Sequence, residues 1–441
     1  MSSSPGRCCS ERGACAAGAA AVAPDPPAKE QTKEKSAESK IILRKRAGKR
    51  IVPRRRRRRN CIPDDIMNDK ELTAAISQLP ANYTFEVRKT VWRIREMKAK
   101  RVALQFPEGL LMFACVLSDI FRQFTDARIV IMSDVTYGAC CVDDYSARAL
   151  NCDLLVHYGH SCLVPIDVTQ KSADGSTLKA MYVFVGITID VAHLVGCVKA
   201  TFPDRKTRLV LLGTVQFADA VYKAQKELEG EYDFAGISQA KPLSKGEVLG
   251  CTAPTIKSDV EVMVFVADGR FHLESAMIAN PGVKAFRYDP YAKAMTIEKY
   301  DTPGMLTVRK SFVEAARSAK RWGIVLGTLG RQGNPKILER LQHVFKEKGC
   351  STFLLLLSEM FPAKMSLFDE HVDAWVQIAC PRLSIDWGEA FSKPVLSTYE
   401  AFVALGQVEW RQIYPQDFYA KGSGPWTNYY VNDAENKSNL D

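Results

Sequence analysis

The chain repeats one pattern of hydrophobic and polar positions three times. Each copy begins with a basic residue, at Arg101, Arg208 or Arg321, and continues as a short apolar run, a polar or glycine-containing turn and an amphipathic stretch. Short apolar runs followed by helical periodicity are typical of strands in parallel sheets that helices cover. The copies lie a little over a hundred residues apart, which suits compact domains better than a solenoid. We therefore predict an α/β fold with three homologous Rossmann-like domains and small, mostly parallel sheets.

The same reasoning places further elements and the domain borders. Apolar runs predict strands over 128–133, 154–158, 260–267, 353–357 and 374–379, and helical periodicity predicts helices over 69–79, 87–100, 110–124 and 337–348. The predicted α/β domains are 61–200, 201–310 and 311–413. The aromatic, Gly/Pro-containing tail 414–441 is expected to lie over the surface. Residues 1–60 are predicted to be a disordered basic tail, because they contain little that could close a core.

The net charge of +10 comes from the first sixty residues. They carry 17 Lys and Arg against 5 Asp and Glu, whereas the remaining residues carry 43 against 45. A basic chain suggests nucleic-acid binding, but the folded part is nearly neutral, so we do not expect a nucleic-acid partner. The run Arg54 to Arg59 has three interpretations: a solvated tail, a nuclear-import signal or an RNA-contacting arm.

Composition also limits the cellular compartments in which the protein is expected. No uninterrupted apolar run reaches the ~18–20 residues of a membrane-spanning helix, so no membrane partner is expected. The chain has 13 cysteines, and its N-terminus is Ser/Ala/Gly-rich where a signal peptide would have an apolar core. This combination argues against a secreted disulfide framework. We expect reduced thiols and a cytoplasmic protein, present also in the nucleus if the arginine run directs import.

Three cysteines follow predicted strands or apolar runs in three different domains. Cys140 comes after the strand that ends near residue 133, Cys251 follows a short apolar run and a glycine, and Cys380 ends a strand that Pro381 terminates. Ligands of open parallel sheets bind at the carboxyl ends of the strands. One thiolate from each of three similar domains would form a site on a pseudo-threefold axis, so we predict a pseudo-threefold arrangement around a central site.

Three thiolates suit a cubane iron–sulfur cluster. They would hold three irons and leave the fourth open to a substrate, which distinguishes catalytic clusters from electron carriers. Zinc is the alternative metal, although the closely spaced Cys/His pairs of structural zinc sites do not occur around these cysteines. Cys141 competes with Cys140 as the ligand from the first domain.

Other thiols and histidines have simpler interpretations. Cys115 lies among Leu, Met and Phe on a predicted helix and is expected in the core. Cys152 and Cys162 flank the strand 154–158, and His157 and His160 lie nearby, so a metal site there is an alternative. We favour packing for His157 and a pocket-lining or hydrogen-bonding role for His160.

The sequence resembles the diphthamide-synthase family around these residues. Seven strings between about residues 68 and 418 carry the resemblance, and so dispersed a set is specific where any one string would not be. They are Gln105-Phe-Pro-Glu-Gly-Leu-Leu, Asp134-Val-Thr-Tyr-Gly-Ala-Cys-Cys-Val-Asp-Asp, Asp153-Leu-Leu-Val-His-Tyr-Gly-His-Ser-Cys-Leu, Gly250-Cys-Thr, Asp268-Gly-Arg-Phe-His-Leu-Glu, Gly327-Thr-Leu-Gly-Arg-Gln-Gly and Ala379-Cys-Pro-Arg-Leu-Ser-Ile-Asp.

The resemblance implies a [4Fe–4S] cluster held by Cys140, Cys251 and Cys380, with no catalytic side chain beyond these ligands. It implies the first step of diphthamide biosynthesis, in which the 3-amino-3-carboxypropyl group of S-adenosylmethionine is transferred as a radical to C2 of a histidine imidazole of translation elongation factor 2. The implied partners are a homologous second subunit, with which this chain would form a heterodimer as the catalytic subunit, and a small metal-containing electron-donor protein.

Such a sulfonium co-substrate carries an adenine, a ribose, an amine and a carboxylate, so its pocket needs turns with free N–H groups and charged partners. Two glycine-containing turns qualify, and neither is the GxGxxG fingerprint of dinucleotide sites. The predicted contacts are Gly213, Gln216, Gly327, Thr328, Arg331, Gln332 and Arg382. For Arg331 and Arg382 the alternative is an ion pair with a carboxylate at the surface.

Three other functions stay open at this stage. One is a [4Fe–4S] lyase or dehydratase similar to quinolinate synthase, in which the open iron acts as a Lewis acid. Another is a non-catalytic RNA-binding or ribosome-associated protein that uses the basic tail. The last is a subunit that only scaffolds its partner.

Overall fold

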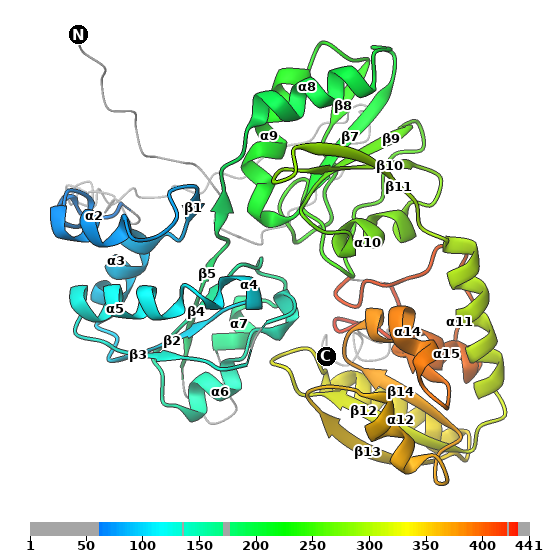
Figure 1. Cartoon of the computed structure of the whole chain (residues 1–441). Helices are drawn as coiled ribbons and strands as arrows, with labels where there is room; N and C mark the ends of the chain where they lie inside the picture. Colours follow the sequence, from blue (N-terminus) through cyan, green and yellow to red (C-terminus); the bar gives the residue numbers. More distant parts are fainter. Residues whose placement is uncertain (1–60, 135, 171–176, 421–422, 431–441) are drawn as a thin grey trace, which may run out of the picture. The chain divides into compact units, whose positions relative to one another are not determined.

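The computed structural model describes residues 61–134, 136–170, 177–420 and 423–430. The predicted basic tail with its arginine run and the last eleven residues lie outside this range. Residues 60–441 form one compact unit. Within its described part lie three larger sheets of four, five and four strands and a two-stranded sheet, so the chain has the mixed α/β fold with several small, mostly parallel sheets (Figure 1).

The first sheet is wholly parallel, with the strand order β3-β2-β4-β5. Its strands are β2 (Arg101–Gln105), β3 (Arg128–Ile131), β4 (Leu154–Tyr158) and β5 (Lys179–Val183). The accompanying helices are α1 (Asp64–Met67), α2 (Lys70–Ile76), α3 (Val87–Met97), α4 (Glu108–Leu111), α5 (Ala114–Phe124), η1 (Ala139–Cys141), α6 (Asp144–Ala149) and α7 (Ile166–Gln170). The short strand β1 (Tyr83–Thr84) pairs antiparallel with β6 (Gly186–Ile187).

The second sheet has the order β11-β10-β9-β7-β8 and is parallel except for its edge strand β11. Its strands are β7 (Arg208–Gly213), β8 (Phe234–Gly236), β9 (Val262–Val266), β10 (Lys284–Asp289) and β11 (Ala294–Glu298). The helices of this segment are α8 (Val191–Thr201), η2 (Val215–Phe217), α9 (Ala218–Leu228) and α10 (Phe271–Ala279).

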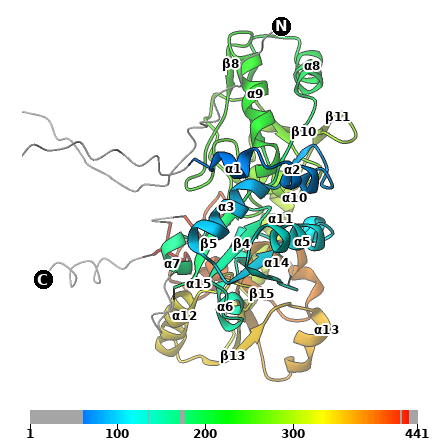
Figure 2. The ribbon, with the colours of Figure 1, turned by 90° about the vertical axis from the view of Figure 1, so that its left-hand side faces the viewer.

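The third sheet is again wholly parallel, with the order β13-β12-β14-β15. Its strands are β12 (Arg321–Gly327), β13 (Ser351–Leu357), β14 (Ala374–Ile378) and β15 (Val395–Ser397). The helices are α11 (Thr302–Ala316), α12 (Pro335–Glu347), α13 (Pro362–Met365), η3 (Ser366–Phe368), α14 (Pro381–Trp387), η4 (Gly388–Ala390) and α15 (Thr398–Ala404). In Figures 1 and 2 the helices α8 and α9 lie together, and α12 lies beside β13. Helix α9 also contacts β7.

The three sheets share one topology. If the parallel strands of each sheet are numbered along the chain, every sheet reads 2-1-3-4, and β11 is an antiparallel addition to the second. The three repeats predicted from the sequence each open on the first strand of a sheet, β2, β7 or β12, so these strand positions are confirmed. The domain borders and the pseudo-threefold arrangement stay predictions.

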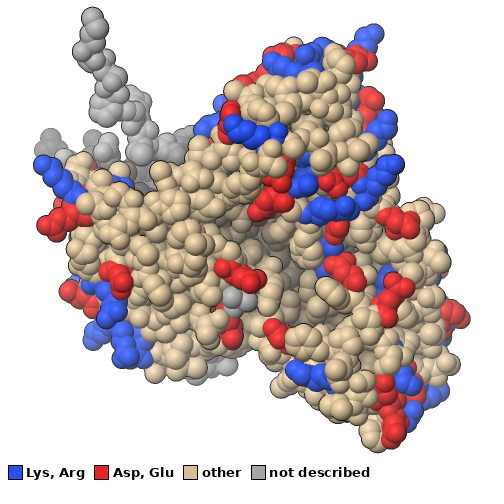
Figure 3. Space-filling view, in the orientation of Figure 1, with Lys and Arg blue, Asp and Glu red and all other residues tan. Residues whose placement is uncertain are grey.

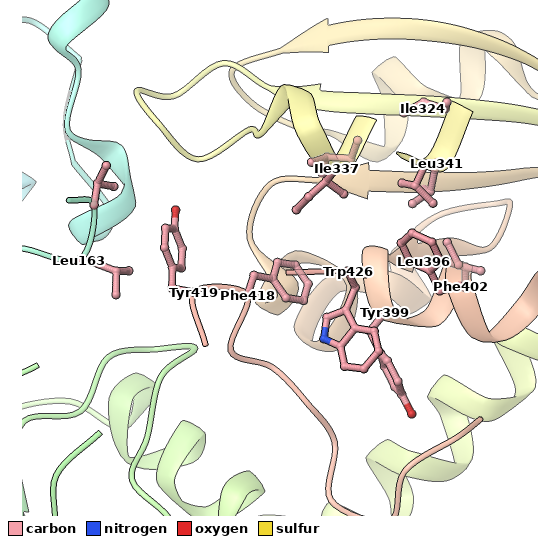
Figure 4. Packing of buried hydrophobic residues seen from close by; sticks show 14 of the residues in the cluster. Leu163, Ile324, Ile337, Leu341, Leu396, Tyr399, Phe402, Phe418, Tyr419 and Trp426 are labelled. Atoms are coloured by element: carbon pink, nitrogen blue, oxygen red, sulfur yellow. The ribbon is translucent and has the colours of Figure 1, made fainter. Parts of the chain in front are cut away.

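The described part of the C-terminal segment, residues 414–420 and 423–430, is packed into the core rather than laid over the surface, so the prediction was wrong for this part. Tyr414, Phe418, Tyr419 and Trp426 are buried in the same core cluster as Tyr399 of α15. The rings of Tyr399 and Trp426 meet edge to face with centroids 5.0 Å apart, and Figure 4 shows Tyr419 between Leu163 and Phe418. Large aromatic side chains gain most from burial, and this outweighs the turn-forming composition of the segment.

Cys115 was predicted in the core, and the structure contradicts this. The expected helix 110–124 is split into α4 and α5, and Cys115 on α5 is exposed. The buried stripe of α5 includes Leu117, Ile120, Phe121 and Phe124. Residue 115 lies two positions before Leu117, which is about 200° around a helix, so its side chain points away from that stripe.

The surface of the described part carries both charges without a dominant sign. Figure 3 shows Lys and Arg interspersed with Asp and Glu over the visible face. This fits the near balance of 43 basic and 45 acidic residues after residue 60. Among the described helices, none combines the length and hydropathy that a membrane crossing requires.

Candidate functional site

Cys140 lies on the one-turn helix η1, in the loop that leaves β3 and leads to α6. It is half-buried, and its neighbour Cys141 is buried. Gly138 enters the turn, where a Cβ atom would come within 3.6 Å of the Cys140 sulfur. The side chain of Asp143 caps α6 by accepting from the Ser146 amide at 2.9 Å. The turn and the cap together fix the main chain on both sides of the cysteine pair.

Cys251 lies in the loop between β8 and β9, which main-chain hydrogen bonds hold against β7. Gly213 N donates to Gly246 O at 2.8 Å, and Val248 N donates to Gly213 O at 3.1 Å. The run before Cys251 therefore forms only an isolated bridge to β7. A Cβ atom on Gly250 would fall 2.0 Å from the Phe271 ring, so glycine is needed before the thiol for close packing.

Cys380 follows β14 directly and is the N-cap residue of α14, whose first residue is Pro381. Proline suits this first helical position because its fixed φ matches the helix and its missing N–H would be unpaired there. The thiol is therefore placed at the carboxyl end of a central strand, as the sequence predicts. The equivalence of the three cysteines is incomplete, since Cys140 and Cys251 follow the second strand of their sheets and Cys380 follows the third.

The three thiols influence one another electrostatically. A hydrogen bond with Cys141, burial and the charges of Cys141, Cys380 and Cys251 all raise the pKa of Cys140. Burial and the charge of Cys380 raise the pKa of Cys251, and burial raises that of Cys380 to about 11. A bound cation would supply the positive charge that favours their thiolate forms.

Hydrogen bonds also connect the cysteine loops. Arg331 N donates to Cys140 O at 3.0 Å, so the turn after β12 meets the Cys140 loop. The Arg382 side chain donates to Gly250 O at 3.4 Å, so the Cys251 and Cys380 loops meet.

The described residues contain no site for a single metal ion. Among the described residues, no three His, Cys, Asp or Glu side chains gather closely enough to hold one metal ion. This applies equally to the alternative site around Cys152 and Cys162. A cubane bonds each thiolate to a different iron, so its protein ligands stand farther apart than those of one zinc ion. Cys140, Cys251 and Cys380 have the thiolate donors that a cubane needs.

The two predicted arginine contacts are held in ion pairs beside the cysteines. Arg331 donates to both oxygens of buried Asp144 at 2.6 and 2.7 Å, lies 4.0 Å over the Tyr145 ring, and donates its main-chain N–H to Cys140 O at 3.0 Å. Arg382 is 3% exposed. It donates to Glu274 at 2.6 Å and to Asp386 at 2.9 Å. These pairs tie the third sheet to the cysteine loops of the other two.

The other predicted contacts lie at the carboxyl ends of β7 and β12. Gly213 and Gly327 end these strands, and Thr328 N donates to Leu357 O at 2.9 Å. Gln216 donates to Gly159 O at 3.0 Å. The Gln332 oxygen lies 3.2 Å from the place of a Cβ atom on Gly327. Their contacts with S-adenosylmethionine stay predictions.

Two histidines from different sheets face the same region. Burial and the charge of His272 lower the pKa of His160 to about 4, and burial and the charge of Arg382 lower that of His272 to about 4. Thr136 Oγ1 lies 3.4 Å from His160 Nδ1, which agrees with the hydrogen-bonding role predicted for this histidine. His272 was not predicted. Its position in the first turn of a helical run, in the string Asp268-Gly-Arg-Phe-His, is the only sequence signal.

Two buried polar residues, Gln105 and His157, form a hydrogen-bonded pair beside the Cys140 loop, and the sequence predicted neither the pair nor a role for Gln105. Gln105 ends β2, and its Oε1 lies 2.9 Å from His157 Nδ1. Glutamine oxygen only accepts hydrogen bonds, so His157 donates through Nδ1. His157 also packs edge to face against Tyr182 with ring centroids 5.4 Å apart, as the packing interpretation predicts. A glutamine at the end of an apolar strand is a sequence signal from which this pair could have been predicted.

His157 should make the protein less stable in acid. Burial lowers its pKa well below 6.5. At a pH between the lowered pKa of the folded state and the ordinary pKa of 6.5, His157 binds a proton in the unfolded chain but not in the folded chain. The free energy of unfolding therefore falls as the pH falls from 6.5. Replacing His157 by Asn should flatten this dependence by at most about 1.4 kcal/mol per pH unit. Urea unfolding between pH 7.5 and 5 measures the slope, and equal slopes for both proteins would contradict the assignment.

Comparison with known proteins identifies the family of the chain and solved structures with a similar fold. A sequence model of the diphthamide synthesis protein family matches residues 106–415. Proteins of Bos taurus and Homo sapiens named 2-(3-amino-3-carboxypropyl)histidine synthase subunit 1 are each 55% identical over 369 residues, which cover 83% of this chain and 82% of theirs.

Solved structures of Dph2 from Pyrococcus horikoshii have a similar fold. One is 25% identical with a TM-score of 0.61, over 74% of this chain and 92% of that one. Another, which holds a 4Fe-4S cluster, is 24% identical with a TM-score of 0.62, over 76% and 93%. The family match and the curated relatives both cover most of the sequence that forms the three sheets, and the chain therefore belongs to the diphthamide synthesis protein family.

Proposed function

We propose that this chain is the catalytic subunit for the first step of diphthamide biosynthesis. It transfers the 3-amino-3-carboxypropyl group of S-adenosylmethionine to C2 of a histidine imidazole of translation elongation factor 2. The observation that supports the proposal is that Cys140, Cys251 and Cys380 lie in loops of three sheets and that hydrogen bonds join these loops to neighbouring ones, from Arg331 N to Cys140 O and from Arg382 to Gly250 O. The names of the relatives and the 4Fe-4S cluster of the Dph2 structure support it.

Cys140, Cys251 and Cys380 would hold the [4Fe–4S] cluster around a central site. When bound, the cluster supplies one electron and an iron that no protein ligand occupies. The imidazole C2 is a weak nucleophile, which is a physical reason for radical rather than polar alkylation. The chain's own part is then to bind and orient the two substrates and to exclude water.

The predicted co-substrate contacts follow the ends of β7 and β12. The main-chain N–H groups of Gly213 and Thr328 are bonded within the protein, so side chains would supply the polar contacts. Arg331 and Arg382 place two cations next to the cysteine loops. We propose that these arginines orient the carboxylate of S-adenosylmethionine while their ion pairs with Asp144 and Glu274 hold the guanidinium groups in place.

Assembly and location complete the proposal. The relatives are named as subunit 1, which supports a complex with a homologous second subunit. A small metal-containing protein would deliver the electron. We propose a cytoplasmic location, with nuclear entry if the run Arg54 to Arg59 acts as an import signal.

The decisive experiment uses the anaerobically purified complex with its partner subunit, dithionite as reductant, S-adenosylmethionine and elongation factor 2. We expect cleavage of S-adenosylmethionine to methylthioadenosine and a 3-amino-3-carboxypropyl adduct on one histidine, located by mass spectrometry. Omission of dithionite is the control and should give neither product. An intact co-substrate in the reduced complex would favour lyase chemistry instead. Removal of residues 1–60 should leave the activity unchanged, whereas a loss would favour a function in the basic tail.

A further inference from the structure

Two glutamine side chains are buried inside apolar strands next to cysteine loops. Gln105 on β2 is 1% exposed and Gln377 on β14 is 0% exposed. Their strand neighbours Leu104, Val376 and Ile378 are also buried. A buried amide is costly unless its polar atoms find partners, so the partners of these two side chains explain their presence.

Gln105 binds the main chain on the C-terminal side of Cys140. Its Nε2 donates to Cys141 O at 2.9 Å, and its Oε1 accepts from Asp143 N at 3.2 Å. The same oxygen accepts from His157 Nδ1 at 2.9 Å. The amide therefore bridges β4, β2 and the loop that presents Cys140, and His157 fixes which way the amide faces.

Gln377 holds the loop of the third cysteine through its Nε2 alone, because its buried Oε1 has no hydrogen-bond partner among the described residues. Its Nε2 donates to Cys380 O at 2.8 Å and lies 3.0 Å from Ser384 Oγ. Cys380 is the N-cap of α14, so this contact ties the first turn of the helix to the centre of the sheet. The Cys251 loop is held differently, by main-chain bonds to Gly213 at the end of β7.

We propose that Gln105 and Gln377 are positioning residues that fix the main chain of two cysteine loops and so hold the Cys140 and Cys380 thiols toward the shared site. The inference rests on the proposed function for the identity of the group that these thiols bind. The anchoring itself concerns only contacts within this chain, and it can be measured with or without that group.

The first measurement is hydrogen exchange of the full-length chain, with mass spectrometry of peptides. Gln105→Met should speed exchange in peptides covering 139–146, and Gln377→Met in peptides covering 380–386, each by about five- to tenfold, the range expected for loss of one hydrogen-bonded anchor. Gln225→Met is the matched control, because Gln225 also donates to a main-chain carbonyl, Ala235 O at 3.2 Å, but away from the cysteines. Unchanged exchange in both loops would overturn the proposal.

The second measurement follows the cluster after anaerobic reconstitution of the complex. Gln105→Met and Gln377→Met should alter the g-values or broaden the electron paramagnetic resonance signal of the reduced cluster and speed iron loss to a chelator, whereas Gln225→Met should match the wild type. Signals and iron loss equal to the wild type in both variants would overturn the proposal. If the wild type binds no cluster, the proposed function fails while hydrogen exchange still decides the anchoring.

His157 provides a milder test if Gln105→Met does not fold. Asn places an amide N–H close to the position of Nδ1, so His157→Asn should retain the exchange pattern of the loop 139–146. His157→Leu removes the donor and should speed exchange there. Equal exchange in His157→Leu and the wild type would show that the Gln105 anchor does not depend on its partner and would overturn this arm of the proposal.

Discussion

Replacement of Cys251 by Ala is expected to abolish cluster binding and to reduce aminocarboxypropyl transfer by more than about 100-fold. Loss of a residue that merely orients a metal ligand typically costs about 10–100-fold, and Cys251 is proposed to be a ligand itself. Its half-buried thiol lies in a loop that main-chain bonds fix to β7, so no neighbouring side chain can move into its place without breaking them. Cys140→Ala and Cys380→Ala should behave in the same way.

Iron counting and cluster spectroscopy of the anaerobic complex provide the measurement. Cys141→Ala is the sharpest control, because it changes the residue next to Cys140 and tests the competing assignment. Cys350→Ala changes a half-buried thiol near Ala319 O, outside the site. Both controls should retain a full cluster. A normal cubane in Cys140→Ala together with iron loss in Cys141→Ala would show that Cys141, and not Cys140, is the ligand from the first sheet.

Replacement of Arg309 by Met should destabilise the protein by about 3–5 kcal/mol, the usual cost of breaking a buried ion pair. Arg309 is 1% exposed and Glu400 is 0% exposed. The guanidinium donates to both oxygens of Glu400 at 2.7 Å and to Ser384 O and Val395 O at 2.8 Å. Its loss leaves a carboxylate without its counter-charge in the core.

Chemical unfolding measures this effect, with Arg317→Met as the control. Arg317 pairs with Glu314 at the surface, where both side chains are well exposed, so its loss should cost less than about 1 kcal/mol. The double variant Arg309→Met/Glu400→Gln should recover part of the loss, because it removes the buried charge as well. A cost below about 1 kcal/mol for Arg309→Met alone would contradict the assignment.

The sequence predicted the strands because their hydrophobic pattern is local. The central strands β2, β4, β7, β9, β12 and β14 are apolar runs buried almost throughout, and a parallel strand covered on both faces needs such a run whatever its neighbours are. Short edge strands were missed for the opposite reason. Of these, β11 alternates exposed and half-buried positions, and β8 has only three residues.

The placement of the thiols at the ends of strands or apolar runs could also be predicted, because strand ends are marked by glycine and proline. Pro381 after Cys380 and Gly250 before Cys251 provide these marks. The convergence of the thiols could not be derived from them, since it depends on how three sheets pack together. The charge of Cys380 acts on Cys251, which lies over a hundred residues away in the sequence.

The sequence by itself determined the first strand of each sheet, most of the central strands and the cysteines that follow strands or apolar runs, because each depends on neighbouring residues. Only the tertiary structure decided that Arg331 pairs with Asp144, that the C-terminal aromatic residues are buried, and that Gln105 binds the Cys140 loop. Each of these contacts joins segments distant in the sequence. Local periodicity records which face of an element is buried, but the partner that covers this face is fixed only when the elements pack.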